Sequence, residues 1–151
     1  MVSDSDFASD LKIWPYPEGN LLYSYYDVGI SYVNETDNNI YFYVRYHYLY
    51  GGTTWKSHPT TPKIGYVYNQ IFAFSSTLKH DIAWIGDSHY ILVYTGINKN
   101  ESIHTVDIWV TTANSSFIWK RPTQIVDTPG YDSYPVVEYY DKTDTIIVLF
   151  M

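Results

Sequence analysis

Residues 27–32 (DVGISY), 81–85 (DIAWI) and 135–140 (PVVEYY) are three versions of one short apolar phrase, and they decide the fold class. Each version begins 54 residues after the previous one. A polar turn follows each version and leads into a second apolar run: residues 40–44 (IYFYV), 90–94 (YILVY) and 145–150 (TIIVLF). A period of this size, built of paired strands, is typical of repeated β units such as blades.

The composition also favours strands. The 151 residues include 18 tyrosines and 5 tryptophans, and aromatic and β-branched side chains fit a pleated, half-buried surface. The apolar runs alternate or are short, and Gly, Asn, Asp and Pro bound them. We therefore predict an all-β fold.

Charge and cysteine content exclude several classes of function. The 16 acidic residues outnumber the 9 lysines and arginines, which are not clustered, so nucleic acid and anionic membrane surfaces are not expected partners. No apolar run approaches the roughly 18 residues of a membrane span. The chain has no cysteine, which excludes disulfides, thiol nucleophiles and cysteine-based zinc sites.

The pattern divides the chain into two parts. Residues 1–20 are acidic and interrupted by Pro15 and Pro17, so we expect an extended N-terminal segment. Residues 21–151 form the repeat region, with repeats starting near residues 27, 81 and 135. The second repeat predicts a four-stranded meander, and the third supplies two strands. The four predicted strands of the second repeat are residues 80–85, 89–95, 103–112 and 118–126.

Two turn segments match a known motif, Ser-x-Asp-x-Gly-x-Thr-Trp. Residues 48–55 (YLYGGTTW) keep its Gly, Thr and Trp but have tyrosines at the Ser and Asp positions. Residues 112–119 (TANSSFIW) keep the Trp and have Thr and Asn at those positions. The motif is the Asp box, and residues 21–151 thereby resemble the sialidase-like β-propeller superfamily. The resemblance implies about two and a half four-stranded antiparallel blades, in which the box has a structural role.

This number of blades raises the question of closure, because propellers close with four to eight blades. We expect the chain to be a fragment of a longer propeller or a subunit that completes a ring by assembly. A curled sandwich that shares only the phrase is the third alternative.

The resemblance suggests where an enzymatic site would lie. Sialidases of the family use an arginine triad, but this chain has only Arg45 and Arg121, so that site is not carried over. Five-bladed glycosidases instead place acids on their innermost strands. Asp27, Asp81 and Glu138 lie on or beside the opening strands and are candidates for acid, base or nucleophile. The alternative is that they are ordinary turn and edge residues.

Aromatic residues are candidates for ligand binding, because ring faces stack on sugars. Tyr48 and Tyr50 lie in a predicted loop, and Trp84 and Trp109 lie on predicted strands. The alternative for the two tryptophans is burial between blades.

Asn34, Asn100 and Asn114 begin glycosylation sequons in predicted turns, which favours an extracellular or cell-surface location. Polar loop residues of a cytoplasmic protein are the alternative.

No cofactor is predicted, because the chain has no spaced Asp-x-Asp-x-Asp loop of the kind that binds calcium. The alternative is a calcium ion bound by acidic loop residues. These acids are Asp37, Asp141 and Asp144. The five histidines lack zinc-ligand spacing, although His80 and His89 approach each other if they face across a hairpin.

The sequence therefore predicts a non-catalytic, secreted or cell-surface propeller module that binds a glycan or a protein. A glycoside hydrolase fragment and a self-assembling structural subunit, which would be a homo-oligomer, are the alternatives.

Overall fold

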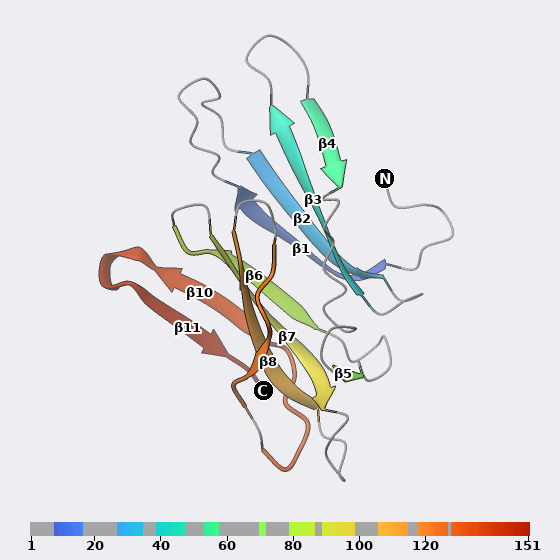
Figure 1. Cartoon of the computed structure of the whole chain (residues 1–151), viewed down its shortest axis with the longest axis vertical. Coiled ribbons are helices and arrows are strands. Elements are labelled where there is room, and N and C mark those ends of the chain that lie inside the picture. The colour runs from blue at the N-terminus through green and yellow to red at the C-terminus, as the bar shows by residue number, and fades with distance from the viewer. Residues whose placement is uncertain are drawn as a thin grey trace.

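The computed structural model of the chain is all-β, as the sequence predicts (Figure 1). Its strands form three antiparallel sheets in the part of the chain that is described. In that part, no helix has the length and apolar character needed to cross a bilayer. The described residues are 8–16, 27–34, 39–47, 53–57, 70–71, 79–86, 89–98, 106–114, 118–126 and 128–151.

The N-terminal sheet is a meander in the order β1-β2-β3-β4. Its strands are β1 (Ala8–Tyr16), β2 (Asp27–Asn34), β3 (Asn39–His47) and β4 (Thr53–Ser57). Strand β1 comes from the predicted extended N-terminal segment and forms one edge. Pro15 lies in β1, and proline, which has no N–H to donate, is found in sheets mainly on edge strands.

The central sheet is built around β7, which pairs with β8 along one edge and with β5 and β6 along the other. Three of the strands predicted for the second repeat correspond to β6, β7 and β8. The fourth is reduced to β9, because Pro122 interrupts the predicted strand and has no N–H to donate. The strands are β5 (Gln70–Ile71), β6 (His80–Trp84), β7 (Tyr90–Asn98), β8 (Val106–Ala113) and β9 (Thr123–Gln124).

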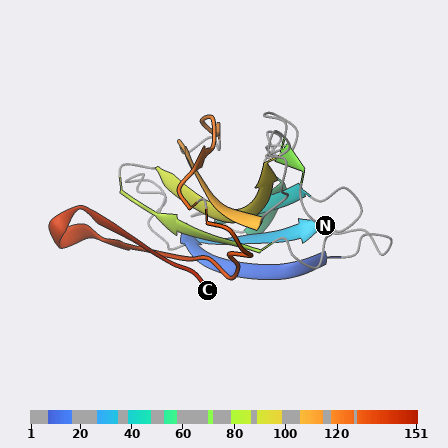
Figure 2. The same ribbon diagram turned by 90° about the horizontal axis from the view of Figure 1, so that it is seen from below.

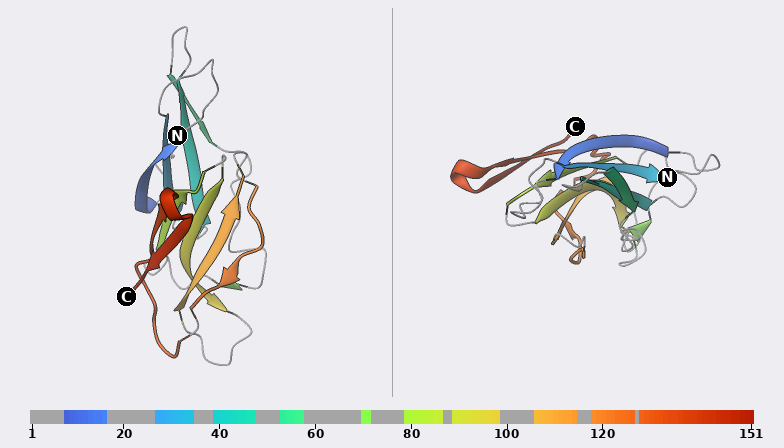
Figure 3. Two further views of the ribbon diagram at one scale, coloured as in Figure 1. Left: turned by 90° about the vertical axis from the view of Figure 1, so that its left-hand side faces the viewer. Right: turned by 90° about the horizontal axis from the view of Figure 1, so that it is seen from above.

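The C-terminal hairpin consists of β10 (Val136–Tyr140) and β11 (Thr145–Leu149), joined by the 3-10 turn η2 (Asp141–Thr143). At its base, Ser133 and Met151 exchange two backbone hydrogen bonds, of 2.7 and 2.9 Å. Viewed from below and from above, the turn of the hairpin extends away from the other two sheets (Figures 2 and 3).

The central sheet is covered on both faces. Residues 90–96 of β7 are all buried, and side chains alternate between the faces of a strand. Tyr90, Leu92 and Tyr94 join a core with Trp14, Val33, Ile40 and Phe42 of the N-terminal sheet. Ile91 and Val93 pack on the opposite face against Val137 and Val148 of the hairpin. The three sheets are therefore layered in chain order.

Two glycines allow tryptophans to lie flat on neighbouring strands. Gly29 is paired with Trp14, and a Cβ at position 29 would overlap the indole ring. Gly96 is covered by Trp109, whose ring atoms would lie 3.1 and 3.2 Å from a Cβ there. These contacts explain why the first repeat has Gly29 where a larger side chain would otherwise suit a strand.

Candidate functional site

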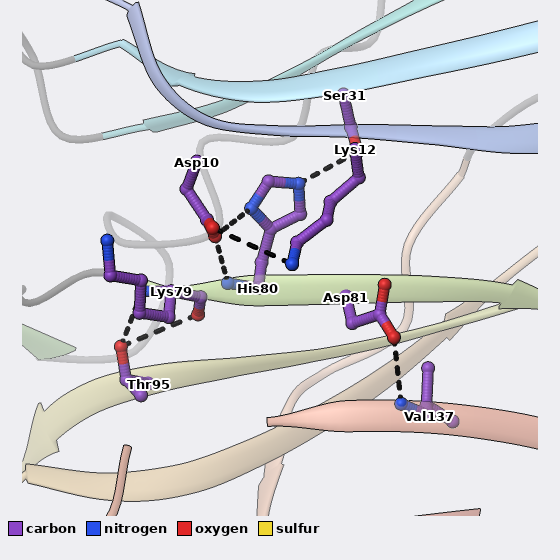
Figure 4. Close-up of polar contacts among 8 residues, drawn as sticks. All are labelled: Asp10, Lys12, Ser31, Lys79, His80, Asp81, Thr95 and Val137. Carbon is purple, nitrogen blue, oxygen red and sulfur yellow. Dashed lines mark hydrogen bonds and ion pairs between the residues drawn. The ribbon is translucent and has the colours of Figure 1, made fainter. Parts of the chain in front are cut away.

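A bulge in β1 directs the first residue of the site towards the central sheet. Between the pairs Ser9–Val33 and Lys12–Ser31, β1 has two residues, Asp10 and Leu11, where β2 has one. Asp10 has a φ of 50°, a left-handed conformation that Asp tolerates better than most residues. Such bulges bend a strand and change the direction of a side chain. Here the carboxylate of Asp10 reaches the start of β6 (Figure 4).

Asp10, His80 and Ser31 form a hydrogen-bonded chain between the N-terminal and central sheets, in which Ser31 and His80 are buried and Asp10 is partly buried (Figure 4). Oδ2 of Asp10 accepts bonds from the backbone N–H of His80 at 2.6 Å and from Nδ1 at 2.9 Å. Nε2 lies 2.8 Å from Oγ of Ser31. Because an ionised carboxylate only accepts, Nδ1 carries the proton, and Nε2 accepts the Ser31 hydroxyl proton.

The charges of this network follow from its burial. Desolvation opposes ionisation of Asp10, but the hydrogen bonds and charge interaction with His80 outweigh it and hold its pKa below the ordinary value. Burial lowers the pKa of His80, although the Asp10 carboxylate acts in the opposite direction. Nζ of Lys12 lies 3.7 Å from Oδ1 of Asp10 and adds to the stabilisation of the carboxylate. Near neutral pH the network therefore contains an ionised Asp10 and a neutral His80.

The order of these contacts is that of a Ser–His–Asp hydrolytic triad. A hydrolase also needs space at the serine for a substrate carbonyl and donors for the oxyanion. Ser31 and His80 are both 0% exposed, so a substrate reaches Oγ only if the two sheets separate. In the structure, the chain of bonds joins the two sheets.

Asp81 provides a second polar contact, on the other side of the central sheet. Its Oδ2 accepts a 2.9 Å bond from the backbone N–H of Val137 in β10. Residues 80 and 81 are consecutive on a strand, so their side chains point to opposite faces. Strand β6 thus holds the N-terminal sheet through His80 and the hairpin through Asp81, as Figure 4 shows. The backbone before it is fixed by Thr95, whose Oγ1 accepts from the Lys79 N–H at 2.8 Å.

The three candidate catalytic acids occupy different environments. Asp27 is the first residue of β2 and pairs with Tyr16. Asp81 is engaged with the Val137 N–H, whereas Glu138 is exposed on the next position of β10, on the opposite face from the buried Val137. Asp81 and Glu138 therefore do not face a common space, which a pair acting on one glycosidic bond requires.

The candidate aromatic residues also differ. Trp109 is 9% exposed and belongs to the core between the N-terminal and central sheets. It therefore has a packing role, which was the alternative to ligand binding. Trp84 is 36% exposed at the end of β6. Tyr48 and Tyr50 lie outside the described residues.

The three sequons are equally varied. Asn34 ends β2 and is 6% exposed, so a glycan there requires the end of the strand to open. Asn114 is exposed, and its Oδ1 accepts a 3.1 Å bond from the Ile118 N–H. Asn100 lies outside the described residues.

The histidines and loop acids that were considered as metal ligands do not come together. His80 pairs with Tyr94 at one end of the β6–β7 hairpin, whereas His89 precedes β7 at the other end. Asp144 accepts a 3.0 Å bond from the Tyr139 hydroxyl, and Asp37 lies outside the described residues. Among the residues that the structure describes, no three His, Asp or Glu side chains are grouped so that they could hold a metal ion.

Comparisons with known proteins found no matching family model, no matching curated protein and no matching solved structure.

Sequence reasoning missed Asp10 and Ser31. Asp10 sits in an acidic stretch and comes to the site only through the bulge, which no local pattern marks. Ser31 lies within the first repeat phrase, where it reads as an ordinary strand residue. The available signal was the pair His80-Asp81 at the start of a predicted strand. Because side chains alternate along a strand, the two residues point to opposite faces of the sheet, and one of them can therefore contact each neighbouring layer.

Proposed function

We propose that the chain is a non-catalytic, propeller-like module that acts through contacts with other proteins. The observation that carries this proposal is the burial of Ser31 and His80 in the Asp10–His80–Ser31 network. Its serine and histidine are sealed between two sheets, so the polar groups best arranged for chemistry serve to join the layers instead.

The layering supports the propeller part of the proposal. The N-terminal sheet is a four-stranded meander, and the central sheet is packed on both faces against neighbours, as blades around a propeller axis are. Trp119, at the end of the second box-like segment, packs against Phe42 with ring centroids 5.1 Å apart. That contact fits the structural role that the Asp box has in the family.

Exposed aliphatic side chains favour a protein as the partner. The outward positions of the hairpin carry Val136, Ile147 and Leu149, and β1 exposes Leu11 and Ile13. Aliphatic surfaces of this kind are covered by protein, whereas sugar binding needs exposed ring faces. Trp109 offers no such face, whereas Trp84, Tyr131, Tyr134 and Tyr140 are exposed, so a glycan is the alternative partner. We further propose a cell-surface or secreted location, which the exposed sequon at Asn114 supports.

A serine-directed fluorophosphonate probe, used together with ester and glycoside substrates, tests the absence of catalysis. We expect the wild-type protein to show no more labelling or turnover than Ser31→Ala, because Oγ is not accessible. Labelling that disappears in Ser31→Ala would overturn the proposal and make the network a catalytic triad. A glycan array is the second measurement, in which binding that is lost in Trp84→Ala would replace the protein partner with a sugar.

A further inference from the structure

We propose that strand β11 is an interaction edge that pairs with β11 of a second copy of this chain. Two hairpins would then form one continuous four-stranded antiparallel sheet, in the order β10-β11-β11-β10. The inference deepens the proposed function, because it names the partner and the surface through which the module makes protein contacts.

The Asp81 contact shows which backbone groups of β11 are free to pair. Because the Val137 N–H donates to Asp81, it points away from β11. The pair Val137–Val148 is therefore a non-hydrogen-bonded pair of the ladder, and such pairs alternate with hydrogen-bonded ones. By this alternation, the N–H and C=O groups of Ile146 and Val148 point to the outer edge of the hairpin.

The outer edge of β11 lacks a partner strand among the described residues, where β11 pairs only with β10. Figure 1 shows β10 lying between β11 and the central sheet, so the opposite edge of β11 faces outwards. Strand β7, the second strand of the preceding hairpin, has this edge paired with β8 over residues 90–97. The equivalent edge of β11 is therefore suited to pairing.

The sequence of β11 also lacks the usual protection of an edge. Proteins prevent edge pairing with lysine, proline, bulges or inward charges. Residues 145–150 (TIIVLF) contain no charge and no proline, and β11 pairs with β10 without a register shift. Ile146, Ile147 and Leu149 are exposed, so pairing would also bury apolar surface.

A second copy fits this edge by symmetry. Antiparallel pairing of identical strands produces a two-fold axis, which gives a closed dimer. If Ile147 lies on the axis, Ile146 of each copy exchanges hydrogen bonds with Val148 of the other. Asp144 then lies opposite Phe150, so the acidic turns of two chains with a net charge of -7 do not face each other. A strand from elsewhere in a longer chain, placed as β8 is on β7, is the competing occupant.

Solution mass measured by light scattering after size exclusion tests the proposal. We expect a concentration-dependent species of twice 17.6 kDa. Ile146→Pro removes the edge N–H in both copies and leaves the bonds to β10 in place, so it should weaken the dimer at least about tenfold. Ile146→Ala keeps the N–H and is the matched control, which should still dimerise.

Ile147→Lys is a second variant that retains every backbone group. It places two lysines opposite each other at the axis, so it should also give a monomer with an unchanged far-ultraviolet spectrum. A wild-type monomer at high concentration, or an Ile146→Pro dimer as stable as the wild type, would overturn the pairing. Neither result affects the fluorophosphonate and glycan experiments, so this inference and the proposed function fail separately.

Discussion

The two faces of the central sheet are held in different ways. On the N-terminal side, a cluster of large aromatic and aliphatic side chains is accompanied by a partly buried carboxylate, a buried imidazole and a buried hydroxyl that are bonded to one another. On the hairpin side, a smaller aliphatic cluster is accompanied by one bond from a backbone N–H to Asp81. The junction between the N-terminal and central sheets combines buried apolar side chains with specific hydrogen bonds. The junction between the hairpin and the central sheet leaves most of the hairpin exposed. A sheet that keeps an exposed edge and an exposed face is the one available for a partner.

The largest effect is expected from Asp10→Ala. It leaves two buried donors of His80 without their acceptor, which should lower the free energy of unfolding by about 3 kcal/mol or more. Chemical denaturation monitored by tryptophan fluorescence measures the loss. Leu11→Ala, at an exposed neighbouring position, is the control and should change stability by about 0.5 kcal/mol or less. Equal effects of the two substitutions would show that the network contributes little.

A smaller and more local effect is expected from Asp81→Ala. The substitution removes the acceptor of the Val137 N–H and should cost about 1 to 2 kcal/mol. This bond connects the hairpin, and no other sheet, to β6. Hydrogen exchange should therefore accelerate at Val137 and in β10 and β11 before it does so in β7. Asp81→Asn retains an acceptor oxygen and serves as the matched control. Uniform acceleration through β7 would instead indicate that the hairpin and the central sheet open together.

The smallest effect is expected from mild acidification, and it should belong to the junction between the N-terminal and central sheets. The folded-state pKa of His80 lies below its ordinary value of 6.5, so the unfolded chain binds the proton more readily. Stability should therefore be complete above about pH 6.5 and fall as the pH decreases towards the folded-state pKa.

Asp10 adds a second loss at lower pH. Its pKa is held below 3.8 in the folded state, so its contribution disappears as the pH falls below that value. Melting temperatures of the wild type and His80→Gln between pH 7.5 and 5 isolate the His80 contribution. The variant should lose the part of the slope that His80 causes, and parallel curves would contradict the assignment.

Local patterns predicted the parts of the fold that depend on neighbours in sequence. The hairpins of the second and third repeats follow from alternating apolar residues and polar turns, and β6, β7, β10 and β11 lie close to the expected positions. Strand β9 is shorter because Pro122 lacks a donor. The 54-residue repeat relates β2 to β6, but in space β6 lies beside β1 and β10, a relationship that depends on how the sheets stack.

The sequence by itself determined that this protein is an acidic, cysteine-free chain of short antiparallel strands, because propensity, charge and alternation are local properties. Only the tertiary structure decided that Asp10, His80 and Ser31 meet, since they are brought together by a bulge in one sheet and the packing of another. It also decided that Asp81 holds a hairpin instead of facing Glu138. Contacts between sheets depend on the register and stacking of distant strands, and no single stretch of residues encodes them.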